Sequence, residues 1–258
     1  MSYTNVMVEK RDRIGFITLN RPQAMNTFNV PLARELNDAL WEMERDPEVR
    51  VVVIDANGKH FSTGISLDEF KEKTSKEYCE FIHLMDEHNH TIARMKKPVI
   101  ASVKGYALAN GAGLSFACDL TVAAEDAKFG TTAINVGLIC LGPAAPLAKN
   151  VGRKKALEMV LTGDIIPAAE AQRLGLVNKV VPSDQLEEAT RELAAKLVAK
   201  SPLALQMGKA GIYGMEDVPY HRALDMLSEM FAALCSTEDA EEGVKAFLEK
   251  RKPEWRER

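Results

Sequence analysis

The stretch from residue 97 to residue 114 constrains the fold most, because it joins a buried strand to a helix through a turn of very small residues. An apolar run over residues 99–103 ends at Gly105, and alanine and glycine then predominate as far as Gly113. Small side chains let the backbone approach another group closely and leave the amide groups at a helix start uncovered. Such amides carry the positive end of the helix dipole and suit a developing negative charge. A plain strand-to-helix turn is the alternative interpretation.

A second turn of this kind follows another buried strand. Residues 51–54 read Val-Val-Val-Ile, a β-branched run of the kind found in a strand covered on both faces. The turn that follows leads into a helix expected over residues 76–95. Another helix is expected over residues 31–45, and residues 120–124 form a further buried strand. This alternation of strands and helices predicts an α/β layered core.

The pattern changes near residue 200. Strands and helices alternate up to that point, whereas the chain from Pro202 to Lys250 is helical throughout. We find no repeat of fixed period and no linker that would separate two independent domains. The sequence therefore predicts a core over residues 1–200 followed by a helical region over residues 201–258.

Composition and charge exclude several classes of function. The 258-residue chain has a net charge of −4, which argues against a general nucleic-acid or anionic-membrane partner. Its four cysteines include no C-x-x-C pair, so they fit free thiols in a reducing compartment better than disulfides or a metal site. No apolar run approaches 18 residues, and the first residues lack the basic-then-apolar pattern of a signal peptide. We therefore expect a cytoplasmic protein with no membrane partner.

Histidines are the first candidates for proton transfer. In the helix expected over residues 76–95, His88 falls on the same stripe as Met85 and Ile92, so periodicity points it toward the core. A lone histidine in such a position is more often a satisfied core residue than a catalyst. His90 falls off the stripe, and periodicity alone places it in solvent.

A series of short motifs covers nearly the whole chain. In order they are LNRP at 19–22 with Asn26, FSTG at 61–64, KPVIA at 97–101, GYAL at 105–108, ACDL at 117–120, AAEDAKFG at 123–130, NVGL at 135–138, GLVNKVV at 175–181 and FLEKR at 247–251. Two glycine-containing turns that each open a helix are what an oxyanion site with two backbone donors needs. The series resembles the crotonase superfamily, the enoyl-CoA hydratase/isomerase family.

The resemblance implies a fold and a mode of assembly. Members of the family form a spiral of ββα units, and their C-terminal helices pack on the core and against neighbouring subunits. A homotrimer or a homohexamer is therefore expected. The substrate implied is an acyl-CoA thioester, with coenzyme A as part of the substrate and no separate cofactor.

The resemblance also implies an oxyanion hole. The family holds the enolate-like oxygen of the thioester with two backbone amides, which by position belong to Thr63 and Asn110 in this chain. The family usually has Ala and Gly at these positions. Because the donor is a main-chain amide, the replacements keep it, although they narrow the pocket.

Further positions match the family's substrate contacts. Ala24 and Asn26 lie where the coenzyme A moiety is bound, and Ile65, Ser66 and Leu67 follow the pantetheine path. The full set expected to contact substrate is Ala24, Asn26, Thr63, Gly64, Ile65, Ser66, Leu67, Leu108, Asn110, Ala133 and Leu141.

Both catalytic glutamates of the hydratases are absent by position. One would stand where this chain has Gly113 and the other where it has Ala133. Neither residue can move a proton, and general acid–base catalysis is worth roughly 10²–10⁴-fold. Standard hydration is therefore not expected, and neither is the isomerase mechanism that depends on the second glutamate.

The 4-chlorobenzoyl-CoA dehalogenases offer a partial match. They share Gly at position 113 and a histidine at a position that corresponds to His90. Their nucleophilic Asp would fall at Leu141 and their Trp at Ala133, however, and displacement fails without its carboxylate nucleophile. His90 is kept as a candidate acid or base on this positional match, against the periodicity that favours His88.

Two classes of function stay open. The first is an acyl-CoA enzyme with non-standard proton-transfer groups: an atypical hydratase/isomerase, a decarboxylase or a hydrolase. The second is a catalytically degenerate protein or subunit that binds acyl-CoA. Cys140 is the one reactive side chain expected at the floor of the pocket, although a buried small hydrophobe is its more common role. RNA binding lacks the Lys/Arg stripe that it needs.

Overall fold

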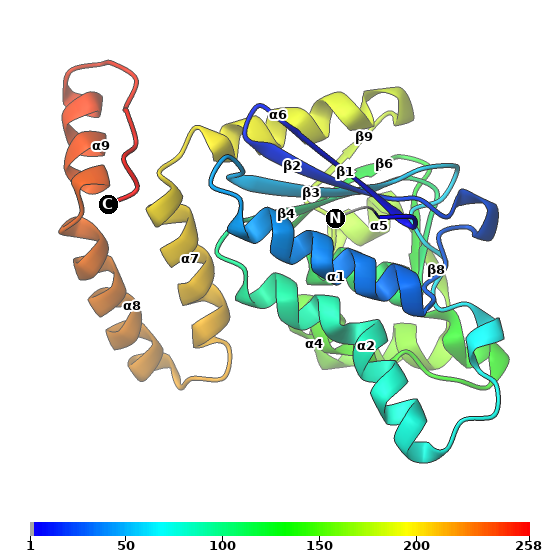
Figure 1. The fold of residues 1–258 in the computed structure, drawn as a ribbon. Helices are drawn as coiled ribbons and strands as arrows, with labels where there is room; N and C mark the ends of the chain where they lie inside the picture. The colour runs from blue at the N-terminus through cyan, green and yellow to red at the C-terminus, as the bar shows by residue number, and fades with distance from the viewer. Residues whose placement is uncertain (1–2) are drawn as a thin grey trace.

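The computed structural model describes residues 3–258 and shows the α/β layered architecture that the sequence predicts (Figure 1). The strands are β1 Val6–Arg11, β2 Ile14–Leu19, β3 Val51–Ala56, β4 Val99–Val103, β5 Tyr106–Leu108, β6 Leu120–Ala124, β7 Lys128–Gly130, β8 Ile165–Pro167 and β9 Lys179–Val181. The α-helices are α1 Val30–Arg45, α2 Ser75–Arg94, α3 Asn110–Ala117, α4 Leu141–Thr162, α5 Ala168–Arg173, α6 Leu186–Val198, α7 Pro202–Met215, α8 Tyr220–Cys235 and α9 Glu238–Leu248.

The main sheet has six strands in the order β1-β2-β3-β4-β6-β9. β1 pairs with β2 antiparallel, and every other pairing in this sheet is parallel. A smaller sheet has the order β5-β7-β8. β3 and β4 lie in the middle of the main sheet and are buried almost throughout, which confirms the interpretation of their apolar runs.

Helices cover both faces of the main sheet. In Figure 1, α6 crosses above the sheet, while α1 and α2 lie below it. Successive side chains of a strand point to opposite faces. Accordingly Val51 and Val53 pack in the cluster with Leu186 of α6, whereas Val52 and Ile54 pack in the larger cluster with α1 and α2. Each fully buried aliphatic side chain contributes about 1.5–3 kcal/mol.

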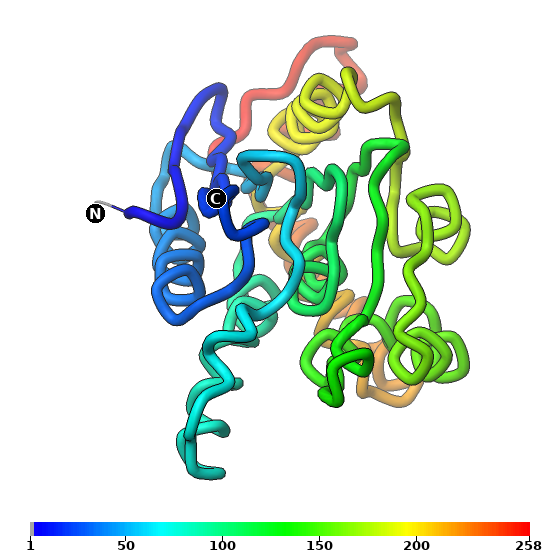
Figure 2. Tube along the Cα trace, turned by 90° about the vertical axis from the view of Figure 1, so that its right-hand side faces the viewer, coloured from blue at the N-terminus to red at the C-terminus, as the bar shows by residue number. Residues whose placement is uncertain are grey.

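Two of the core helices begin with side-chain caps. The Asn29 side chain accepts a hydrogen bond from the Leu32 amide at 3.0 Å, so α1 starts at Val30, one residue before the expected start. Thr74 and Glu77 form a capping box at the start of α2. Both Figures 1 and 2 show the first part of α2 projecting beyond the body of the core.

Of the C-terminal helices, α7 lies beside the core, and α8 and α9 lie farther out (Figure 1). Lys209 of α7 makes a 2.7 Å ion pair with Asp119, and the Tyr213 hydroxyl donates to the same carboxylate at 3.1 Å. Large apolar side chains on α7, α8 and α9 are exposed: Ile212, Tyr220, Leu224, Phe231, Val244, Phe247 and Leu248. A boundary at residue 200 and packing of this region on other subunits remain predictions. None of the helices within residues 3–258 is both long and apolar enough to span a membrane.

Candidate functional site

The two glycine-containing turns of the sequence are held side by side by backbone hydrogen bonds. The Ser62 amide donates to the Tyr106 carbonyl at 3.1 Å, and the Leu108 amide donates to the Ser62 carbonyl at 2.9 Å. Gly111 lies so close to the Ser62 backbone that any side chain at position 111 would overlap with it. The start of α3 is therefore pressed against the turn that carries Thr63.

The first turn of α3 presents free amides. Among residues 3–258, the backbone N–H groups of Asn110, Gly111 and Ala112 have no hydrogen-bond partner, and no side chain caps the helix. The preceding residue, Ala109, has φ 47° and ψ −119°. A residue with a Cβ adopts this conformation only at a cost of about 1–3 kcal/mol, and such strain concentrates at functional sites.

The amide of Thr63, the other predicted donor, is already engaged. It donates to the Met25 carbonyl at 3.2 Å, at the long end of the range for such bonds. Met25 has a left-handed backbone conformation with φ 51°, which turns its carbonyl toward Thr63. An oxygen bound at this position has to share the Thr63 amide with Met25 or displace it.

Both turns open into a cleft of about 1440 Å³. Most of its lining is apolar, with Phe70, Tyr78 and Ile82 on one side and Leu138 and Leu141 among the residues of the segment 132–143. Eight of the eleven predicted substrate contacts line this cleft: Ala24, Thr63, Ile65, Ser66, Leu67, Asn110, Ala133 and Leu141.

The other three predicted contacts do not line the cleft, and their hydrogen bonds to the surrounding backbone explain why. The side chain of Asn26 is fully buried, and it donates to the carbonyls of Asn57 at 2.9 Å and His60 at 2.8 Å. It also accepts from the Arg21 amide at 2.7 Å, so it braces the loop from inside. The Gly64 carbonyl accepts from the Phe28 amide, and the Leu108 amide donates to the Ser62 carbonyl.

The positions expected for the two glutamates differ in the room that they offer. A Cβ at Gly113 would lie 2.9 Å from Pro143 Cγ, too close for an undisturbed fit. Ala133 is half-buried and lines the cleft. Neither residue carries a group that can exchange a proton.

The two candidate histidines of α2 lie outside the cleft. His88 is buried against Phe28, with ring centroids 5.4 Å apart, and this burial lowers the pKa of His88 to about 4. The inward direction that periodicity predicts for His88 is confirmed. His90 is exposed and lines a different cavity, which also contains Lys209 and Tyr213.

The predicted site residues do not include the one carboxylate that lines the cleft within residues 3–258, that of Asp86. Tyr78, Ile82 and Asp86 recur every four residues, so one face of α2 lines the cleft. His90 continues that row, but it lies about 6 Å further along the helix axis, beyond the cleft. The four-residue spacing was the signal in the sequence. It was masked because the adjacent core stripe carries the stronger apolar pattern.

Asp86 is held at the junction of three helices. Asn110 Nδ2 donates to Asp86 Oδ1 at 3.3 Å and to the Met85 carbonyl at 3.1 Å. The carboxylate lies against Gly142, where any side chain would overlap with it. Burial raises the pKa of Asp86 above its ordinary value. Cys140, which also lines the cleft, has a buried thiol whose pKa is raised by burial as well.

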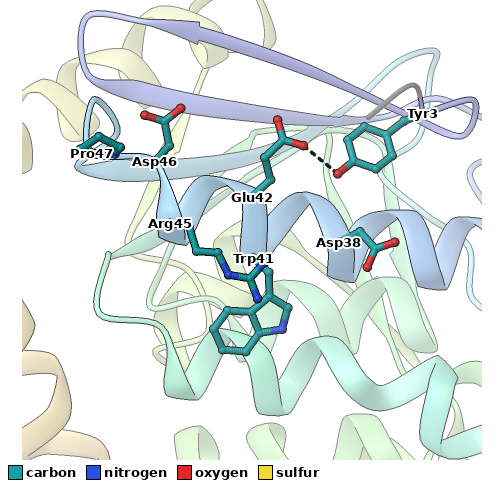
Figure 3. Close-up of a pocket in the computed structure, with 7 residues that line it drawn as sticks. All are labelled: Tyr3, Asp38, Trp41, Glu42, Arg45, Asp46 and Pro47. Carbon is teal, nitrogen blue, oxygen red and sulfur yellow. Dashed lines mark hydrogen bonds between the residues drawn. The ribbon is translucent and has the colours of Figure 1, made fainter.

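A separate hollow over α1 is a weaker candidate (Figure 3). Most of its polar side chains are bonded to, or stacked on, neighbouring groups. The Tyr3 hydroxyl donates to Glu42 at 2.9 Å, and the Arg45 guanidinium lies 5.6 Å from the Trp41 ring centroid. Asp46 at its edge is paired with Lys10. The cleft beside α3 combines free donors with an apolar lining, and this hollow does not.

Comparison with known proteins assigns the family. Over residues 9–258 the sequence matches the family model described as enoyl-CoA hydratase/isomerase. The chain belongs to this family. The resemblance of its motifs to the enoyl-CoA hydratase/isomerase family is confirmed.

Individual relatives match over their full length. The chain is 38% identical over 266 residues to a probable enoyl-CoA hydratase of Rhizobium meliloti, with 100% of both chains covered. It is 37% identical over 259 residues to 2,3-dehydroadipyl-CoA hydratase of Escherichia coli, covering 99% of this chain and 100% of that protein.

Solved structures of relatives share the fold. The crystal structure of enoyl-CoA hydratase from Mycobacterium smegmatis superposes with a TM-score of 0.94 at 38% identity, covering 98% of this chain and 99% of that chain. Human enoyl coenzyme A hydratase domain-containing protein 3 gives a TM-score of 0.94 at 34% identity, covering 98% and 100%. The crotonase-like fold expected from the motifs is thereby confirmed.

Proposed function

We propose that this member of the enoyl-CoA hydratase/isomerase family binds an acyl-CoA thioester in the cleft and stabilises the enolate of that thioester. The observation that carries the proposal is the uncapped start of α3, where Asn110, whose amide has no partner within residues 3–258, lines an apolar cleft. The thioester oxygen accepts from Asn110 and from Thr63, whose long bond to Met25 gives way or is shared. One preorganised donor of this kind is worth about 2.7–4 kcal/mol at the transition state.

The lining of the cleft supports an apolar acyl group. Phe70, Tyr78 and Ile82 face the cleft together with Leu138 and Leu141, so the acyl chain leaves water on binding. The relatives named above as hydratases include one named for a CoA thioester, which is consistent with coenzyme A as the carrier. No cofactor beyond the coenzyme A of the substrate enters the proposal.

The reaction differs from standard hydration, because Gly113 and Ala133 stand where hydratases have glutamates. Atypical hydration or isomerisation, decarboxylation and hydrolysis all begin from a stabilised thioester oxyanion. Decarboxylation asks least of the side chains, since loss of CO₂ leaves its electron pair in the enolate. The protein works in the cytoplasm as a homotrimer or homohexamer joined through α7–α9, and light scattering on the purified protein tests that assembly.

The second candidate is an acyl-CoA-binding protein without turnover. It is favoured by the same two substitutions and by the engaged Thr63 amide. A panel of crotonyl-, 3-enoyl-, malonyl- and aromatic acyl-CoA thioesters separates the two proposals by calorimetry and product analysis. Turnover of any of these thioesters supports the enzyme. Tight binding of several without product supports the binding protein, and no binding contradicts both.

A further inference from the structure

The cleft contains one carboxylate that neither glutamate position accounts for. Asp86 comes from α2, a different element from those that carry Gly113 and Ala133. It is the one Asp or Glu among residues 3–258 that lines the cleft.

Two contacts fix where the Asp86 carboxylate lies. Asn110 Nδ2 donates to it at 3.3 Å, and the bare Cα of Gly142 makes room for it. Gly142 belongs to the first turn of α4, whose positive dipole end favours the negatively charged form of the carboxylate. Burial acts in the opposite direction and favours the protonated form. A group balanced in this way can both take up and release a proton.

Asn110 links this carboxylate to the proposed oxyanion site. Its backbone amide is the free donor at the start of α3, and its side chain holds Asp86. If that amide holds the thioester oxygen, the carbon next to the carbonyl lies within a few ångströms of the same residue. Asn110 would therefore hold both the thioester, through its backbone amide, and the Asp86 carboxylate, through its side chain.

We propose that Asp86 is the catalytic base that removes a proton from Cα of the bound acyl-CoA. The Cα–H bond breaks, its electron pair forms the C=C bond of the enolate, and the carbonyl π pair moves onto the oxygen held by Asn110. The proton moves to the Asp86 carboxylate. It returns to Cα, or to Cγ when the acyl chain is unsaturated at the β,γ bond, so the carboxylate is regenerated without any co-reactant. This inference rests on the proposed function, because it needs a bound thioester.

Solvent exchange of the Cα protons tests the role directly. The full-length protein is incubated in D₂O with phenylacetyl-CoA and with hexanoyl-CoA, and deuterium incorporation is followed by mass spectrometry. Calorimetry gives the Kd of each thioester. We expect exchange to fall at least a hundredfold in Asp86→Asn, in line with loss of a general base. The Kd should stay within about threefold, because Asn keeps the shape of the side chain.

Glu87→Gln is the matched control, since it removes the same charge from the same helix at a residue that does not line the cleft. It should exchange at the wild-type rate. Circular dichroism and thermal unfolding check that both variants fold.

Each outcome is decisive. Wild-type exchange in a folded Asp86→Asn variant overturns the role of Asp86 and leaves the proposed function standing. Binding by the wild type without any exchange of either thioester also overturns it and favours the binding protein. A wild type that binds neither thioester contradicts the proposed function itself.

Discussion

The floor and the wall of the cleft are built in different ways. We call the start of α3, residues 109–112, the floor: Ala109 and Asn110 line the cleft, and the amides of residues 110–112 have no partner within residues 3–258. The wall consists of Asp86 and residues 132–143, and the chemistry that it can provide depends on the side chain at each position. In the proposed function Thr63 and Asn110 supply main-chain donors, which do not depend on the side chains at these two positions. Gly113 and Ala133, by contrast, have no side-chain group that can exchange a proton. A main-chain donor is thus available whatever the residue type, whereas proton transfer needs a particular side chain, which we propose is that of Asp86.

The largest expected effect comes from breaking the floor. In Gly111→Ala the new methyl group overlaps with the Ser62 backbone and forces α3 away from the turn that carries Thr63. We expect Cα exchange to drop by about 10²–10³-fold, as for loss of an oxyanion donor. Overpacking should also cost about 1–3 kcal/mol of unfolding free energy.

Gly208→Ala is the control for that experiment. Gly208 lies in α7, and a Cβ there meets no atom within 4 Å. It should leave exchange unchanged and raise stability by up to about 1 kcal/mol, because alanine is the better helix former. Equal exchange in the two alanine variants would show that the floor does not hold the oxyanion.

The stability of the protein should also depend on pH through His88 of α2, the helix that carries Asp86. The pKa of His88 is about 4 in the folded state, because burial disfavours the charged ring, against about 6.5 when unfolded. The unfolded chain therefore binds an extra proton as the pH falls from about 6.5 to 4, and folding loses about 3 kcal/mol over that window. His88→Leu removes this proton uptake. In urea unfolding, the unfolding free energy of the variant relative to that of the wild type should therefore be about 3 kcal/mol higher at pH 4 than at pH 7. Parallel pH profiles would contradict the assignment.

A smaller effect is expected from displacing the wall carboxylate without removing it. In Gly142→Ala the methyl group overlaps with the Asp86 carboxylate and turns it away from Asn110. Exchange should fall about tenfold to a hundredfold, since a displacement of 1 Å costs up to about 10². In the Asp86→Asn background the same substitution should have little further effect on exchange. Additive losses in that double-mutant cycle would place the defect elsewhere in the cleft.

The smallest effect is a gain of stability at the floor. Ala109 holds a backbone conformation that glycine adopts without strain. Ala109→Gly relieves about 1–3 kcal/mol of strain but gives the unfolded chain more freedom, at about 0.4–1 kcal/mol. We expect a net gain of about 1 kcal/mol in urea unfolding. A loss of stability instead would mean that the Ala109 methyl group contributes packing.

The core and the floor followed from the sequence more fully than the wall did. The β-branched run at 51–54 and the apolar stripe that includes His88 predict burial directly, because buried positions along a strand or helix are occupied mainly by apolar residues. The small residues at the start of α3 predicted uncovered amides, because small side chains cannot cover the N–H groups of a first helical turn. The four-residue row that includes Asp86 is visible in the sequence, but the contact of Asp86 with Gly142 of α4 is long-range, and no local pattern predicts it. The hydrogen bonds of the Asn26 side chain, and the bond from the Thr63 amide to the Met25 carbonyl, depend on how the loops fold, which the sequence pattern does not predict either.

The uncapped turn at the start of α3 also offers a spectroscopic reporter. Amide protons without a partner shift strongly when an acceptor arrives, and Gly111 lies between the two other free donors. The chain has 16 glycines, so ¹⁵N-glycine labelling gives a spectrum with few enough signals to assign this amide by mutation. Titration with free coenzyme A, and then with an acyl-CoA, would separate occupancy of the cleft from contact of the thioester oxygen with the helix. The same resonance would serve to screen acyl groups before any reaction is known.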